Sequence, residues 1–258
     1  MERLNSTKGT GMNRASLRRW GMLFLTAGIL GRGLIQGHIL GIGSLSGQQL
    51  LEMMENTPDA MRYATISIVM QILETCAVPI FALLLVEGFR HTSDFRQYLL
   101  RVLGLAVLTE IPYNMAMSAK LLSMGSRNPV FGMVLGLVML YFYRRYSTGG
   151  MRDLLIKAVV TVAGMVWAQM LKIEFGICLV LIICVMWAFR SRPLYRNFAG
   201  ASAAIVCSIF NPFFLASPMG FLAVHMYNGE DGGENRVFCY LFYPAVLLLS
   251  AIAGWILF

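Results

Sequence analysis

The chain has 258 residues, of which 57% are hydrophobic and only 13% are charged, and its formal net charge is +8. Soluble domains usually carry about 25% charged residues, so this composition excludes an ordinary soluble domain and indicates a protein with several membrane spans. The basic residues cluster in short segments between apolar runs, so the positive charge indicates membrane topology rather than a nucleic-acid partner.

The apolar runs are long and do not alternate with a period of two, so they predict helices rather than the strands of a barrel. Backbone groups in lipid must be satisfied within each segment, which also favours helices. We therefore predict an all-α, polytopic transmembrane bundle of about nine to ten spans. Residues 1–19 form a basic cytosolic tail, and residues 20–258 form one transmembrane domain. The expected spans are about 20–40, 65–86, 98–117, 129–143, 154–171, 175–189, 198–210, 213–227 and 237–258.

Two charged residues fall inside the first two expected spans. The first span is rich in glycine and carries Arg32, and the second span carries Glu74. Charged side chains at membrane depth are costly and mark functional sites or ion pairs. Two interpretations stay open for Arg32: an ion pair with Glu74, or a ligand site.

The basic segments alternate along the chain in a way that predicts its orientation. With the amino terminus in the cytosol, the loops at 90–101, 144–157 and 190–196 all lie on the cytosolic side, as the positive-inside rule requires. The expected span at 213–227 is short and contains Pro218, so a re-entrant segment is the alternative there. We expect a multi-pass protein of the bacterial cytoplasmic membrane, with the lipid bilayer as its main partner.

The second expected span ends in groups that titrate or donate hydrogen bonds. Glu87, Arg90 and His91 are spaced three and four residues apart and share one helical face. Histidine commonly transfers protons near neutral pH, and arginine suits a phosphate group. A solvated helix end is the alternative interpretation.

This stretch also carries a resemblance. Residues 79–92 read PIFALLLVEGFRHT, which resembles the central motif of the TraX family. Three later stretches are similar to that family in order and spacing, namely 109–114, 128–137 and 227–244. That family is known for the protein that N-acetylates the amino terminus of the F-type conjugative pilin, and it is similar to the wider superfamily of transmembrane acyltransferases.

The resemblance implies a function in which an acetyl or acyl group passes from CoA to a peptide amine or a small acceptor. Acetyl-CoA would be a donor substrate, with no permanently bound cofactor and no metal, and the five cysteines form no C-x-x-C pair. Catalysis would fall to His91, oriented by Glu87. We expect donor binding by Arg90, Tyr243 and Asn228, and acceptor binding by Glu110, Tyr113, Asn114, Asn128 and Arg32. Membrane anchoring is the alternative role for Tyr243, and a turn is the alternative role for Asn228.

Several polar positions depart from the family pattern. The Asp-His pair usual in the family's first span is absent from residues 28–33, Asn114 replaces an aspartate, and Val246 replaces a histidine. These departures keep two rival hypotheses open. One is a non-catalytic membrane scaffold or binding protein, and the other is a transporter that uses Arg32 and Glu74.

Overall fold

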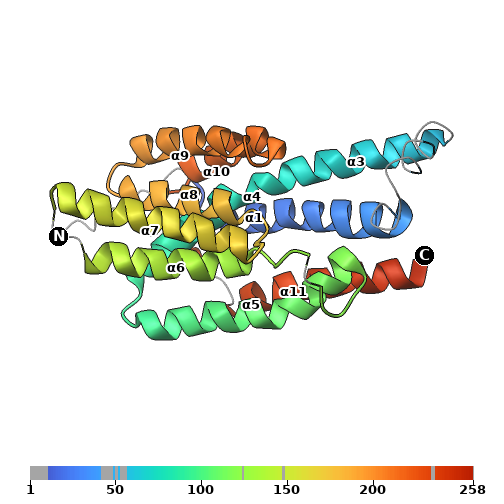
Figure 1. The fold of residues 1–258 in the computed structure, drawn as a ribbon, viewed down its shortest axis with the longest axis horizontal. Helices are drawn as coiled ribbons and strands as arrows, with labels where there is room; N and C mark the ends of the chain where they lie inside the picture. The colour runs from blue at the N-terminus through green and yellow to red at the C-terminus, as the bar shows by residue number, and fades with distance from the viewer. Residues whose placement is uncertain are drawn as a thin grey trace, which may run out of the picture.

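The computed structural model describes residues 11–41, 49, 52, 57–123, 125–146, 149–233 and 236–257. Within them the secondary structure is helical apart from two isolated β-bridges, which confirms the predicted all-α class. The helices run side by side along the long axis of the molecule (Figure 1). Their bounds are α1 Arg14–Ile29, η1 Leu30–Ile39, α3 Pro58–Thr75, α4 Ala77–His91, α5 Phe95–Ser118, α6 Val130–Arg145, α7 Met151–Met170, α8 Gly176–Ala188, α9 Pro193–Cys207, η3 Pro212–Met219, α10 Gly220–His225 and α11 Arg236–Leu257.

Five of these helical segments in the described part of the chain are long and apolar enough to cross a membrane. They are 14–39, 58–91, 95–118, 151–170 and 237–256. The helices α6, α8 and α9 have 16, 13 and 15 residues, fewer than the 17 or more of a typical span. Every span expected from the sequence coincides with one of the helical segments, and the shorter ones complete the bundle between the long ones.

The helix starts follow from local sequence. The side chains of Asn13 and Asp94 accept hydrogen bonds from the backbone N–H groups of Ser16 and Gln97, at 2.8 and 3.0 Å, which caps α1 and α5. Because Asn13 caps it, α1 begins at Arg14, before the start at residue 20 that we predicted. Residues 14–19 therefore belong to the folded helix, and Leu17 is fully buried.

The core lies where α4 and α8 pack together with α6. Its largest buried side chains include Leu83 and Phe89 of α4, Leu140 of α6 and Ile183 of α8. In contrast, large apolar side chains such as Val107 on α5 remain more than half exposed. Contiguous exposed apolar surface of this kind is what a lipid-facing helix presents.

The two ends of the bundle differ in charge. The carboxyl ends of α4 and α6 and the start of α9 lie at one end, and the start of α3 lies at the other end with the chain terminus C (Figure 1). The first end carries Arg90, Arg145 and Arg192. The structure thus brings the basic loops that we expect in the cytosol to one end of the molecule.

Candidate functional site

Two helix breaks pack against each other in the middle of the bundle. The first separates α3 from α4 at Cys76, and the second separates η3 from α10 at Gly220. Two side-chain hydrogen bonds link the first break to η3: the Thr75 hydroxyl donates to the Phe213 carbonyl at 3.2 Å, and the Ser217 hydroxyl donates to the Thr75 carbonyl at 3.0 Å. Interrupted helices at membrane depth occur where backbone is buried in protein or lines a cavity.

Arg32 lies beside these breaks, in the π-helical segment η1. Its Nη2 donates to both carboxylate oxygens of Glu74 at 2.6 Å, which confirms the ion pair that the sequence predicts. Its Nη1 pairs with Glu174, and the guanidinium lies over the Phe175 ring, 5.3 Å from the centroid. One arginine is therefore shared by the buried Glu74 carboxylate and the partly buried Glu174 carboxylate, and the Tyr113 hydroxyl donates to Glu174 at 2.7 Å.

Sequence reasoning did not identify Glu174 as part of this site. It falls in a short turn after α7, where we expect an acid to face water. The only local signal is its place next to Phe175 and the apolar run of α8. The side chain becomes an Arg32 partner because α8 packs deep in the bundle.

A second buried polar group joins α5 to the start of α6. Arg127 donates to Glu110 at 3.1 Å, and the Asn128 side chain donates to Glu110 at 2.7 Å and to the Ala106 carbonyl at 2.9 Å. Asn114, on the same helix as Glu110, is 1% exposed, and its side-chain amide has no hydrogen-bond partner among the described residues. The residues expected to bind the acceptor thus form a buried polar layer, in which Glu110 and Asn128 are engaged with each other.

An elongated basic cleft opens at the end of the bundle that carries the basic loops. Its volume is about 580 Å³, and Arg14, Arg18, Arg101 and His91 lie in its wall. Arg14 pairs with Asp231 at 2.5 Å. We call this space the basic cleft.

His91 is held at the rim of the basic cleft by Glu87. Its Nδ1 lies 2.8 Å from the Glu87 main-chain carbonyl and 3.6 Å from the Glu87 carboxylate. A carbonyl only accepts hydrogen bonds, so Nδ1 carries the proton and Nε2 of the neutral ring keeps a lone pair. Arg90 pairs with Glu87 at 2.8 Å, and neither Arg90 nor Asn228 lines the cleft.

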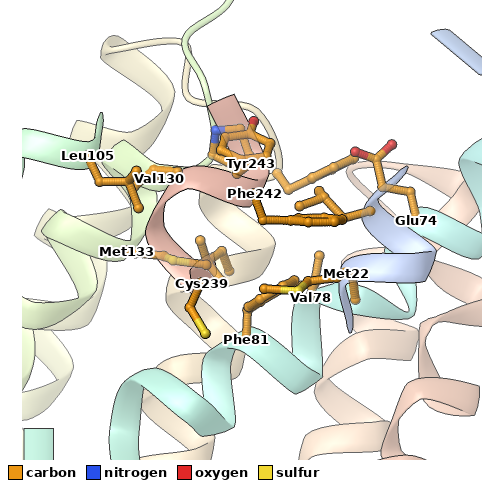
Figure 2. Close-up of a pocket in the computed structure, with 15 residues that line it drawn as sticks. Met22, Glu74, Val78, Phe81, Leu105, Val130, Met133, Cys239, Phe242 and Tyr243 are labelled. Carbon is orange, nitrogen blue, oxygen red and sulfur yellow. The ribbon is translucent and has the colours of Figure 1, made fainter. Parts of the chain in front are cut away.

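An apolar cavity adjoins the basic cleft inside the bundle. Its volume is about 150 Å³. Figure 2 shows Phe81 and Cys239 toward one end of it and Tyr243 and Glu74 toward the other. Its wall and the wall of the basic cleft have five residues in common: Met22, Phe81, Leu105, Met133 and Cys239.

A third cavity lies on the other side of Glu74. Its volume is about 140 Å³, and we call it the arginine cavity. Its wall consists of Arg32, Gln71, Glu74, Glu174, Phe175, Asn211 and Phe213. It shares Glu74 and Phe175 with the apolar cavity. The three spaces therefore adjoin one another in the order basic cleft, apolar cavity and arginine cavity, with Glu74 in the walls of the last two.

The family of the chain follows from its sequence. A family model described as TraX protein matches residues 50–252. The chain belongs to the TraX family. No curated protein and no solved structure matches it.

The TraX match covers the chain from α3 through most of α11, whereas α1 and η1 precede it. Glu74, Glu174 and Tyr243 lie within the matched residues, and Arg32 and Arg18 lie before them. Both parts of the chain therefore contribute to the cavities of this TraX-family protein. In the described part of the chain, no group of three or more His, Cys, Asp or Glu side chains is arranged to hold a metal ion.

Proposed function

We propose that this TraX-family protein transfers an acetyl or short acyl group from CoA to a peptide amine or a small acceptor in the bacterial cytoplasmic membrane. The observation that carries the proposal is the series of three spaces. The donor enters the basic cleft, its thioester reaches the apolar cavity, and the acceptor occupies the arginine cavity. Glu74 and Phe175 lie in the walls of both inner cavities, so donor and acceptor meet there.

The chemistry of the basic cleft suits the nucleotide end of CoA. Arg14, Arg18 and Arg101 lie in its wall, and arginine binds phosphate groups through its planar fork of donors. His91 is also in this wall. Ten residues of α4 separate His91 from Phe81, which corresponds to about 15 Å of helix rise. In this proposal His91 and Glu87 therefore contribute to donor binding at the rim, and proton transfer takes place deeper in the protein.

The size and lining of the apolar cavity suit the thioester end of CoA. A dry cavity of about 150 Å³ holds benzene, which has about six non-hydrogen atoms. An acetyl thioester with the two methylenes next to sulfur is of about the same size, and it contains no amide. The first pantetheine amide then stays in the basic cleft, where polar groups can pair with it. An unpaired amide in the apolar cavity would cost about 1–3 kcal/mol.

The arginine cavity suits a polar acceptor. Gln71 and Asn211 offer amides, and Glu174 offers a carboxylate that can hold an ammonium group. The Arg32 Nε–H has no hydrogen-bond partner among the described residues, so it can donate to an acceptor carbonyl. Tyr113 acts through Glu174, to which it donates.

A transporter is the second candidate, because the helix breaks at Cys76 and Gly220 adjoin the buried ion pair. Broken helices around a charged site are typical of transporters. A scaffold that binds a ligand without catalysis is the third candidate. Neither the transporter hypothesis nor the scaffold hypothesis explains why a basic cleft adjoins an apolar cavity.

Binding of radiolabelled acetyl-CoA to the purified protein in lipid nanodiscs tests the proposal. We expect saturable binding that unlabelled CoA displaces, and that Arg101→Gln weakens several-fold, because one contact from an exposed arginine contributes at most about 1 kcal/mol. Arg62→Gln is the matched control, since Arg62 is exposed at the other end of the bundle. Absence of binding by the wild-type protein would favour the scaffold or the transporter.

A further inference from the structure

We infer that Glu74 is the proton acceptor of the transfer reaction, in a position that the sequence pattern does not assign to catalysis. The inference rests on the proposed function. It starts from the geometry of the cavities: Glu74 and Phe175 are the two residues common to the apolar cavity and the arginine cavity. Of these two, only Glu74 can exchange a proton. A donor carbonyl in one cavity and an acceptor nitrogen in the other approach each other at this carboxylate.

The charges around Glu74 favour this role. Glu74 and Glu174 share the single guanidinium of Arg32. These three side chains therefore carry two negative charges and one positive charge. An amine acceptor arrives as an ammonium ion and supplies the missing positive charge. Glu174, which lines only the arginine cavity, holds the ammonium. Glu74 takes its proton and leaves a neutral nitrogen in front of the thioester.

The remaining steps of the transfer need no reactant other than water. The amine nitrogen forms a bond to the thioester carbonyl carbon, and the carbon–sulfur bond breaks. The proton on Glu74 then passes to the departing CoA sulfur, and the freed Glu74 carboxylate accepts the second proton from the acylated nitrogen. The Tyr243 hydroxyl, beside Glu74 in the apolar cavity, donates to the carbonyl oxygen while it carries negative charge. The products are an amide, CoA thiol and one proton, which Glu74 releases to water as the products leave, so that it returns to its carboxylate form.

The backbone opposite Glu74 makes room for this carboxylate. Gly28 of α1 faces it without a side chain, and a Cβ added there would lie 2.0 Å from Glu74 Oε2. The Glu74 carboxylate of α3 thus occupies the space that a side chain at position 28 of α1 would fill.

A thiol placed at this position tests the geometry without knowledge of the acceptor. In a variant with the native cysteines replaced, Glu74→Cys should become S-acetylated when acetyl-CoA is added at alkaline pH. In that reaction the new thiolate bonds to the acetyl carbon, the carbon–sulfur bond to CoA breaks, and CoA leaves as the thiolate. The measurement is the gain of one acetyl group in the intact mass, located by peptide mapping. Gln71→Cys is the control, because Gln71 lies about one helical turn away and lines only the arginine cavity.

We expect acetylation at position 74 to be at least about tenfold faster than at position 71, since a displacement of a few ångströms from an attack geometry is costly. Equal rates at the two positions, or no acetylation at position 74 in a variant that still binds acetyl-CoA, would overturn the inference. Failure of the wild-type protein to bind acetyl-CoA would instead overturn the proposed function.

Glu74→Gln tests the chemical role in membrane vesicles that contain the native acceptors. Transfer of label from acetyl-CoA should fall roughly 100-fold or more, the range for loss of a general base, while acetyl-CoA affinity stays unchanged. Glu74→Asp should recover part of the rate, because it restores a carboxylate. Glu174→Gln also removes a carboxylate partner of Arg32, and it should raise the acceptor concentration needed for half-maximal rate. Unchanged maximal rate in Glu74→Gln would show that Glu74 only holds Arg32 in place.

Discussion

The Glu74 carboxylate packs directly against the α-carbon of Gly28, so that a methyl group at position 28 would lie 2.0 Å from Oε2 and 2.4 Å from the Glu74 Cβ. The contact brings α1 and α3 together at the level where Arg32 pairs with Glu74. A close approach of this kind is available only to glycine, because any Cβ would occupy the space of the carboxylate.

Gly28→Ala should therefore displace Glu74 and weaken its pairing with Arg32. We expect a loss of about 3 kcal/mol, the scale of an overpacked core site, measured as a lower thermal unfolding midpoint in nanodiscs. Gly104→Ala is the matched control: it lies within α5, and an added Cβ there meets no atom within 4 Å. The control should be neutral or stabilising by about 0.5–1 kcal/mol, because alanine favours helix. Equal effects of the two variants would contradict the contact.

Arg32→Met should be strongly destabilising, because it leaves Glu74 and Glu174 buried without a cation. Breaking a buried ion pair from one side costs about 3–5 kcal/mol, and here two carboxylates lose their partner. Addition of Glu74→Gln and Glu174→Gln to the same variant should recover much of the loss, as measured by yield and unfolding midpoint.

Arg62→Met controls for removal of an arginine as such. Its pair with Asp59 spans 3.5 Å, and both side chains are more than 70% exposed. Surface pairs contribute at most about 1 kcal/mol, so this variant should behave like the wild type. If Arg62→Met lost as much stability as Arg32→Met, the unpaired buried carboxylates could not be the cause of the stability loss in Arg32→Met.

His91→Ala should weaken donor binding several-fold and leave the maximal rate of transfer nearly unchanged. The physical reason is its place at the rim of the basic cleft, with a side chain that is 66% exposed. Acetyl-CoA affinity and the rate at saturating donor are the two measurements. A drop in maximal rate of roughly 100-fold with unchanged affinity would instead identify His91 as the general base.

The orientation in the membrane is open to a labelling experiment. The positive-inside rule predicts that Arg145 and Arg192 face the cytosol and that Asp59 faces outward. In whole cells, an impermeant thiol reagent should therefore label Asp59→Cys and should not label Arg145→Cys or Arg192→Cys, once the native cysteines have been replaced. All three positions should react after the cells are opened. Labelling of Arg192→Cys alone in intact cells would reverse the orientation.

The sequence by itself determined the class of this protein and one of its central contacts. The length and hydropathy of its apolar runs predict membrane helices, because the bilayer sets both the length and the hydrogen bonding of a spanning segment. The cost of an unpaired charge in lipid predicts a partner for Arg32, and Glu74 is the acid in the neighbouring span. These properties can be read from single segments.

Only the tertiary structure shows which side chains share the walls of a cavity. Glu174, which is remote in sequence from Arg32, became its second partner through the packing of α8. The order of the basic cleft, the apolar cavity and the arginine cavity depends on side chains from α1, α3, α4, α5, α6, α8 and α11. The hydrophobic periodicity of one helix shows which of its faces is apolar. It does not show which other helices pack against that face. For this reason the sequence alone singles out His91 as a candidate base, whereas the place of Glu74 in the walls of two cavities is visible only once the helices are packed.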